Sequence, residues 1–332
     1  MKGFRNMNIS QPRIVIIGGG TGLPVLLRGM KRFPVDITAI VTVADDGGSS
    51  GRLREDFRIP PPGDIRNVLA ALSEVEPLIE ELFQHRFETN SDLSGHSLGN
   101  LMLAAMTNIT GNFAHAVHEL SRVLNVKGRV LPSANQSVVL HAEMEDGVII
   151  HGESKIPLYG KRIKRVFLTP DHIHPLPETL YAIREADLIV IGPGSLYTSI
   201  LPNLIVPEIG NELAKAKAKK VYICNLMTQK GETGGFSASD HVKAIYDHTE
   251  PYSIQKIIVN NGYIPDSVKL RYKGEYADPV KIDYDNLEKL GIEIIADSIA
   301  TLTDGFLRHD TKTLSQLIFN ILENETKNRF QS

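Results

Sequence analysis

The sequence has a single cysteine, no marked excess of charge of either sign and no long apolar segment. The single cysteine, Cys224, excludes a disulfide within the chain. Its place in the apolar run VYICNL favours a small buried side chain over a nucleophile. Lys and Arg number 36 against 39 Asp and Glu, a formal charge of -3. Because no basic excess is available to concentrate a polyanion, we expect no nucleic-acid partner.

Long hydrophobic runs are also missing. None approaches the roughly 18 residues that a membrane-spanning helix needs. The N-terminal segment MKGFRNMNISQPR lacks the apolar core of a secretory signal. We therefore expect no membrane span and a cytoplasmic protein. What the chain does contain is 42% hydrophobic and 23% charged residues, the usual balance of a globular protein.

Short runs rich in Val and Ile alternate with segments of helical spacing. This alternation is typical of a parallel sheet with helices on both faces. We expect strands at 13–19, 36–43, 186–193, 219–226, 254–261 and 292–297. We expect helices at 22–32, 64–85, 196–217, 238–248 and 310–323, and a pair within 96–124. The sequence thus predicts a doubly wound, mostly parallel, Rossmann-like α/β sheet in one domain spanning residues 1–330.

Residues 129–168 have a different pattern. Two alternating runs in SVVLHAEMEDGVIIHGESKIP flank Asp146 and Gly147, a short-range hairpin signal. We expect this part of the chain to form a small β insertion or subdomain within the single domain.

The first expected strand ends in GGGTG, directly before a helix. Glycine lets the backbone approach a ligand, and amides at a helix N-terminus favour an anion, so Gly19, Gly20, Thr21 and Gly22 are candidate ligand contacts. Leu23 breaks the G-x-G-x-x-G dinucleotide pattern, and the Lys and Ser/Thr of a P-loop are missing. The alternative is that these glycines only tighten a strand-helix turn.

The second expected strand ends in the polar segment DDGGSSGR. Asp45 and Asp46 suit a ribose hydroxyl or a divalent cation such as Mg²⁺, and they are the candidates for a catalytic or metal-binding role. Gly47 permits close approach, and Ser49 and Ser50 can donate to phosphate oxygens. Adjacent side chains on an extended backbone point to opposite sides, so one acid can instead brace the loop.

Two later strands end in the same kind of chemistry. IGPGSLYTSI supplies Gly194 and Ser195, and NLMTQKGETGG supplies Asn225 and Thr228. Parallel strands end at one edge of the sheet, where such folds bind ligands. Glycine, hydroxyl and amide groups with few charges suit a nucleotide or a nucleotide sugar.

Four further side chains are weaker candidates. Tyr272 can stack on a base, although an ordinary amphipathic Tyr is the simpler interpretation. Arg308 lies just before the last expected helix and can reach a diphosphate. Asp64 suits a helix N-cap. His96 is expected to cap a helix or to be solvated.

Six motifs together resemble the bacterial gluconeogenesis factor family, a branch of the 2-phospho-L-lactate transferase (CofD-like) superfamily. In chain order they are GGGTGLPVLLRGMK, TVADDGGSSGRLR, PPPGDIRN, SGHSLGNL, IGPGSLYTSI and NLMTQKGETGGFS. The resemblance runs from about 13 to 322 and implies a CofD-like Rossmann-type fold. It also implies a cytoplasmic protein that is required for normal cell shape on gluconeogenic carbon sources, and a site for UDP-sugars such as UDP-N-acetylglucosamine. The ligand positions it implies are Gly19, Gly20, Thr21, Gly22, Asp45, Asp46, Gly194, Ser195, Asn225 and Thr228, with Tyr272 and Arg308 as weaker candidates.

Three functions remain open at this level. The first is a UDP-sugar-binding regulator of morphogenesis without turnover. The second is a magnesium-dependent, 2-phospho-L-lactate transferase-like enzyme that acts on a nucleotide diphosphate donor, with Asp45 or Asp46 serving the metal or the attacking hydroxyl. The third, a nicotinamide dehydrogenase, is disfavoured by the broken glycine pattern. A homo-oligomer and protein partners in cell-wall morphogenesis are compatible with the sequence, which does not identify them.

Overall fold

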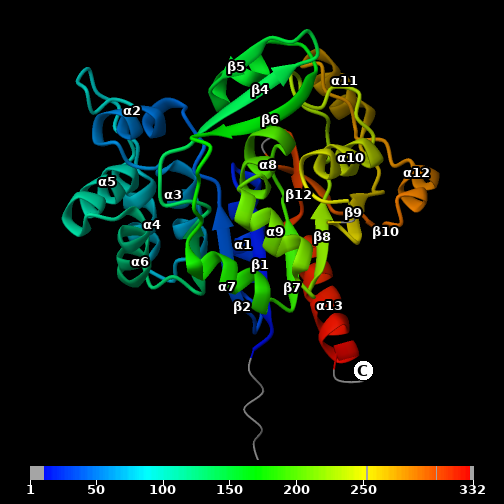
Figure 1. Ribbon diagram of the computed structural model, residues 1–332, viewed down its shortest axis with the longest axis horizontal. Coiled ribbons are helices and arrows are strands. Elements are labelled where there is room, and N and C mark those ends of the chain that lie inside the picture. Colours follow the sequence, from blue (N-terminus) through cyan, green and yellow to red (C-terminus); the bar gives the residue numbers. More distant parts are fainter. Residues whose placement is uncertain (1–10, 252, 304, 330–332) are drawn as a thin grey trace, which may run out of the picture.

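A computed structural model describes residues 11–251, 253–303 and 305–329. Residues 1–10, on which the expected absence of a secretory signal partly rests, lie outside this range. At the centre is a seven-stranded parallel sheet (Figure 1). In spatial order its strands are β10 (Glu293–Asp297), β9 (Lys256–Asn260), β8 (Lys219–Ile223), β7 (Leu188–Ile191), β1 (Arg13–Gly18), β2 (Asp36–Val41) and β3 (Arg129–Pro132).

The order of the strands reverses at β1. β2 lies on one side of β1, and β7, which comes much later in the chain, lies on the other. Gly18 is level with Val41 of β2, and Ile17 is level with Ile191 of β7, so the three strands end at one edge. The expected doubly wound, mostly parallel sheet is confirmed, and the edge at β1 is its topological switch point.

Helices cover both faces of this sheet (Figure 1). They are α1 (Gly22–Met30), α2 (Gly48–Phe57), α3 (Gly63–Leu72), α4 (Pro77–Gln84), α5 (Leu98–Thr110), α6 (Phe113–Val123), α7 (Pro177–Glu185), α8 (Leu201–Leu204), α9 (Pro207–Lys215), α10 (Ala238–His248), α11 (Asp266–Gly274), α12 (Tyr284–Lys289) and α13 (Thr311–Arg329). Within the described ranges, no helix combines the length and the apolar character that crossing a membrane requires.

Helix α1 is held firmly, and this fixes the glycine loop that precedes it. Leu23, Leu26 and Leu27 are fully buried, and each contributes about 1.5–3 kcal/mol through burial. A Cβ at Gly29 would lie 2.7 Å from the Oγ of Ser315, so α1 and α13 pack closely there. The N-terminus of α1 therefore has a fixed position at the switch point.

Two expected helices and one expected loop have different limits in the structure. The segment 64–85 divides into α3 and α4 because Pro77 disfavours a helical residue before it. The segment 196–217 divides into the π-helix η2 (Leu196–Ile200), α8 and α9, with Pro207 beginning the last of these. The segment DDGGSSGR is not a loop throughout, because α2 begins at Gly48 and includes both serines.

Residues 129–168 contribute to two sheets. β3 pairs with β2 at the edge of the main sheet. β4 (Val139–Met144), β5 (Ile149–His151) and β6 (Ile163–Thr169) form a separate antiparallel sheet. The expected turn at Gly147 joins β4 to β5, and the 3-10 helix η1 (Glu153–Leu158) lies between β5 and β6. Figure 1 shows this small sheet at the top of the molecule, beyond the arrowheads of β2 and β8.

A short hairpin completes the fold. β11 (Ala300–Thr303) pairs with β12 (Phe306–His309), and β12 leads directly into α13. The backbone N–H of Leu307 donates to the hydroxyl of Tyr272 over 2.9 Å, which ties the hairpin to α11. This tie brings residues near the C-terminus beside loops from the first strand.

Candidate functional site

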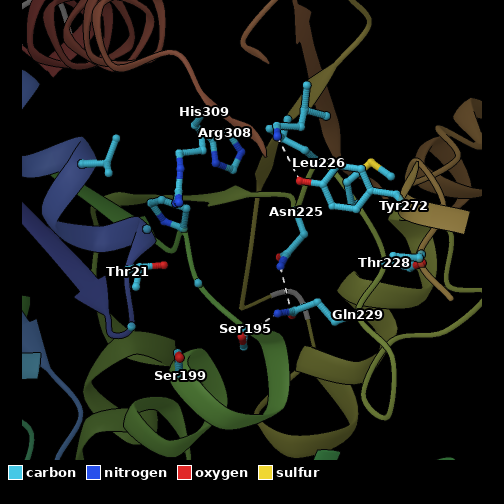
Figure 2. Close-up of a pocket in the computed structure, with 18 of the residues that line it drawn as sticks. Thr21, Ser195, Ser199, Asn225, Leu226, Thr228, Gln229, Tyr272, Arg308 and His309 are labelled. Carbon is cyan, nitrogen blue, oxygen red and sulfur yellow. Dashed lines mark hydrogen bonds between the residues drawn. The ribbon is translucent and has the colours of Figure 1, made fainter. Parts of the chain in front are cut away.

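A cavity of about 430 Å³, here called the main cavity, opens at the carboxyl edge of the sheet. The loops after β1, β7 and β8 line it, together with α11 and β12. Figure 2 shows Thr21 on one side and Tyr272 on the other, with Asn225, Gln229 and Ser195 between them. Among the residues that the sequence singles out, the lining includes Gly20, Thr21, Gly22, Gly194, Ser195, Asn225, Thr228, Tyr272 and Arg308.

The glycine loop and the N-terminus of α1 form one wall of the main cavity. Gly20 has a φ of +64°, a conformation that L side chains rarely adopt. Its N–H donates to the Oδ2 of Asp64 over 2.8 Å. Thr21 precedes α1, so the positive end of this nine-residue helix faces the cavity. The wall suits a phosphate.

Gly19 supports this loop from behind. It does not line the main cavity, but a Cβ there would lie 2.5 Å from the Cγ2 of Thr42 and 2.7 Å from the Oδ2 of Asp64. Only glycine fits at this position without displacing a neighbour. Asp64 itself is in the first turn of α3 and binds the glycine loop, and it is not the N-cap that the sequence suggested.

A chain of hydrogen bonds fixes the polar floor of the main cavity. The Nε2 of Gln229 donates to the Oγ of Ser195 over 2.8 Å, and the Nδ2 of Asn225 donates to the Oε1 of Gln229 over 3.3 Å. Thr228 accepts from the N–H of Asp278 over 2.9 Å. These amide and hydroxyl groups are held in place before any ligand arrives, and they offer donors and acceptors without net charge.

The remaining wall comes from α11 and β12. Tyr272 is half-buried, and its hydroxyl already accepts from Leu307, which leaves the ring as its contact surface. Arg308 is exposed and brings a permanent positive charge to the same cavity as the glycine loop. Chain positions near 20 and near 308 therefore meet at one site.

His309 lines the main cavity and is absent from the residues expected from the sequence. Its Nε2 donates to the carbonyl of Cys224 over 3.2 Å. Burial lowers the pKa of His309 to about 4, so the ring is neutral near pH 7. The only sequence signal for it is its position beside Arg308, just before the last helix.

The two serines of DDGGSSGR lie away from the main cavity. Both are buried in the first turn of α2. The Oγ of Ser49 is 2.9 Å from the Nδ1 of His96 and accepts from the Nδ2 of Asn100 over 3.0 Å. Ser49 thus joins α2 to α5 through Asn100, and His96, which precedes α5, is buried, not solvated.

The paired acids brace loops. The Oδ1 of Asp45 accepts from the N–H of Gly47 over 2.9 Å, and the Oδ1 of Asp46 accepts from the N–H of Ser154 in η1, also over 2.9 Å. Neither acid lines the main cavity, and Gly47 does not line it either.

Glu153 lies within electrostatic reach of Asp64 and Glu232, and of these three acids Asp64 contacts the glycine loop. Burial raises the pKa of Asp64 to about 6. Burial, followed by the charges of Asp45 and Asp46, raises the pKa of Glu153 to about 8. Burial also raises the pKa of Glu232 to about 7, although it accepts from the N–H of Tyr197 over 3.2 Å. The sequence did not identify Glu153 or Glu232, because their proximity depends on η1 folding back over the sheet edge.

No ready-made metal cage is present in the described ranges, where no group of three or more His, Cys, Asp and Glu is arranged to hold an ion. Mg²⁺ is usually held by one or two carboxylates together with the phosphates of a ligand. Asp45 and Asp46 therefore fit a Mg²⁺ role only with a ligand whose phosphates extend beyond the main cavity, which neither acid lines.

The fold and the main cavity define an α/β protein with a polar cleft, lined by a glycine loop, at the switch point of a doubly wound sheet. Residues 14–300 match the family model of the 2-phospho-L-lactate transferase CofD. The chain belongs to the CofD-like family and, within it, groups with the gluconeogenesis factors.

Similar proteins support this placement over almost the whole chain. A gluconeogenesis factor of Bacillus subtilis is 66% identical over 313 residues, covering 94% of this chain and 99% of that protein. One from Listeria monocytogenes is 47% identical over 320 residues, covering 96% and 98%. A crystal structure of a Bacillus halodurans protein matches with a TM-score of 0.92 at 60% identity, covering 93% of this chain and 99% of the other.

Proposed function

We propose that this protein binds a UDP-sugar, such as UDP-N-acetylglucosamine, in the main cavity and acts as a regulator of cell morphogenesis during growth on gluconeogenic carbon sources. The observation that carries the proposal is the meeting of the α1 N-terminus and Arg308 in one cavity. A helix N-terminus and a guanidinium both suit the phosphates of a diphosphate.

The rest of the main cavity supports the nucleoside and sugar parts of such a ligand. Tyr272 offers a ring face at the side opposite Thr21. The chain from Asn225 through Gln229 to Ser195 offers fixed amides and a hydroxyl. The volume of the main cavity, about 430 Å³, falls in the range of small-molecule sites. The regulatory part of the proposal is supported by the name gluconeogenesis factor carried by close relatives.

Calorimetry tests the ligand. UDP-N-acetylglucosamine is titrated into the protein beside GDP- and adenine nucleotides. The Arg308→Ala variant is expected to bind the UDP-sugar about tenfold or more weakly, since one charge-assisted contact to phosphate is lost.

Arg271→Ala is the matched control for that variant. Arg271 stacks on the ring of Phe306 at 4.3 Å and donates to the carbonyl of Gly305, but it does not line the main cavity. Removal of the Arg271 side chain should leave the affinity for the UDP-sugar within about twofold of that of the unmodified protein. Failure of any UDP-sugar to bind, or an equal loss in both variants, would contradict the proposal.

A second candidate function is a magnesium-dependent transferase that acts on a nucleotide diphosphate donor. The match to a transferase family model over residues 14–300 favours it. So does Asp64, which contacts the glycine loop directly. Mg²⁺ would supply charge neutralisation at the diphosphate. Asp45 and Asp46, the candidate residues to hold it, do not line the main cavity, so this function requires a donor that extends beyond that cavity.

A phosphorus NMR time course separates the two candidates. The protein is incubated with Mg²⁺ and with UDP- or GDP-linked donors, and the donor signals are followed. New phosphorus signals that disappear in Asp64→Asn would favour the transferase. Unchanged spectra combined with tight UDP-sugar binding would favour the regulator.

A further inference from the structure

A second cavity of about 390 Å³ lies next to the main cavity. It opens at the carboxyl ends of β8 and β9, the same functional edge of the sheet. Asn225 and Leu226, the residues that line both cavities, form the wall between them. The wall is held by a backbone hydrogen bond of 3.1 Å from Val280 to the carbonyl of Leu226.

Helix α11 spans both cavities. Tyr272 contacts the main cavity and Lys269 the second one. Residues three apart lie on the same side of a helix, so one face of α11 covers both spaces. The second cavity is therefore part of the same ligand-binding edge.

The loop after β9 is shaped to leave this space open. The Nδ2 of Asn260 donates to the carbonyl of Gly262 over 3.2 Å, and its Oδ1 accepts from the N–H of Ile299 over 3.1 Å. A Cβ at Gly262 would lie closer to the Oγ of Ser298 than any real contact allows. Internal hydrogen bonds thus hold the loop in a curve around the cavity, and its shape does not depend on a ligand.

The chemistry of the second cavity differs from that of the main cavity. Its sides are aliphatic, with Val259, Ile264, Val280 and Ile282 among the lining residues. Among the described residues that line it, Lys269 is the only charged one, and its Nζ already pairs with Asp266 at 3.0 Å. An anion would find little unpaired positive charge there, and desolvating it would be costly.

Hydrogen-bonding groups nevertheless reach into this apolar space. Asn261 supplies an amide side chain, and the exposed ring of Tyr263 lies at the rim with the Nζ of Lys269 5.5 Å from its centroid. Aliphatic walls with an amide side chain suit a flat, uncharged group that has hydrogen-bonding edges.

We propose that the second cavity is a binding site for an uncharged aromatic amide or heterocycle, separate from the main cavity. The proposal does not depend on the UDP-sugar assignment, because its ligand class and its test are different.

Ligand-observed NMR and calorimetry test this site with four named probes. Benzamide and nicotinamide are the uncharged ligands, and benzoate and nicotinate are their charged counterparts of nearly equal shape. We expect saturable binding of the two amides to the intact protein and binding of the carboxylates about tenfold weaker or more, because the carboxylate must be desolvated without a free partner.

Cavity-filling variants locate the binding. Ile282→Trp and Val280→Phe place bulk inside the second cavity, and each should weaken amide binding about tenfold or more. Leu302→Trp, on the exposed side of β11, is the matched control and should leave it unchanged. If Ile282→Trp does not fold, Val280→Phe serves alone. The proposal is overturned if neither amide binds, if the carboxylates bind equally well, or if the filled variants keep the affinity of the intact protein.

Discussion

Gly19 occupies a position where no side chain fits. The Cγ2 of Thr42 and the Oδ2 of Asp64 both lie within the space of a Cβ. The next residue donates its N–H to the same carboxyl group. A single hydrogen atom at position 19 therefore allows β1, β2 and α3 to converge behind the glycine loop.

Gly19→Ala should destabilise the protein by about 1–3 kcal/mol, because Thr42 and Asp64 must move to admit a methyl group. Urea denaturation measures the change. Gly234→Ala is the control, since no atom lies within 4 Å of a Cβ there. Equal stability of the two variants would show that the loop is looser than described.

Glu153 carries a pH effect at the scale of one residue. Burial and the charges of Asp45 and Asp46 raise its pKa from 4.5 to about 8 in the folded protein. The folded state therefore holds this proton more tightly than the unfolded chain. Below about pH 4.5 Glu153 is protonated in both states and does not lower the free energy of unfolding. As the pH rises from there toward 8, the free energy of unfolding falls, because only the unfolded chain gives up this proton readily.

Glu153→Gln, which resembles the protonated acid, should remove this loss. We expect this variant to be more stable than the unmodified protein at pH 8.5 but not at pH 5. Denaturant unfolding at the two pH values measures the difference. Glu145→Gln, at an exposed position of the small sheet, is the control. A gain that is the same at both pH values would contradict the assigned pKa.

At the scale of elements, η1 bridges two loops of the main sheet. Its first turn receives Asp46 from the loop after β2. Farther along, a Cβ on Gly231, in the loop after β8, would overlap the carbonyl of Pro157. The small antiparallel sheet is thus attached across the carboxyl edge by close backbone packing.

Gly231→Ala tests this attachment. Gly231 has a φ of +79°, and Gly235 has a φ of +76° with no atom within 4 Å of a Cβ, so the two alanine variants share the backbone strain but not the overlap. Hydrogen exchange in β4 to β6 should become faster in Gly231→Ala only. Equal exchange in both variants would show that η1 is not held by this contact.

The elements also show how far sequence reasoning reaches. The strands were predictable because their β-branched runs are buried on both faces, as in β1 and β7. The limits of two helices were not predictable in the same way, because Pro77 and Pro207 divide longer apolar patterns. The first turn of α2 was misjudged because small polar residues suit both a loop and a helix start, and packing against His96 and Asn100 decides between them.

At the scale of the whole molecule, topology assembles the site. Loops after β1, β7 and β8 were expected to meet because parallel strands end at a common edge, and nine of the expected residues line the main cavity. His309 and the carboxyl groups of Glu153 and Glu232 were not foreseen. Their positions depend on a hairpin, a small sheet and a helix folding over the edge, which no local pattern encodes.

The central claim is that a sugar diphosphate binds between the α1 N-terminus and Arg308. Crystals of the protein soaked with UDP-N-acetylglucosamine test it most directly through difference density. The account predicts the two phosphates within hydrogen-bonding distance of the loop at Gly20 to Gly22 and of the Arg308 guanidinium. Density for the nucleotide elsewhere on the molecule, with the main cavity empty, would contradict it.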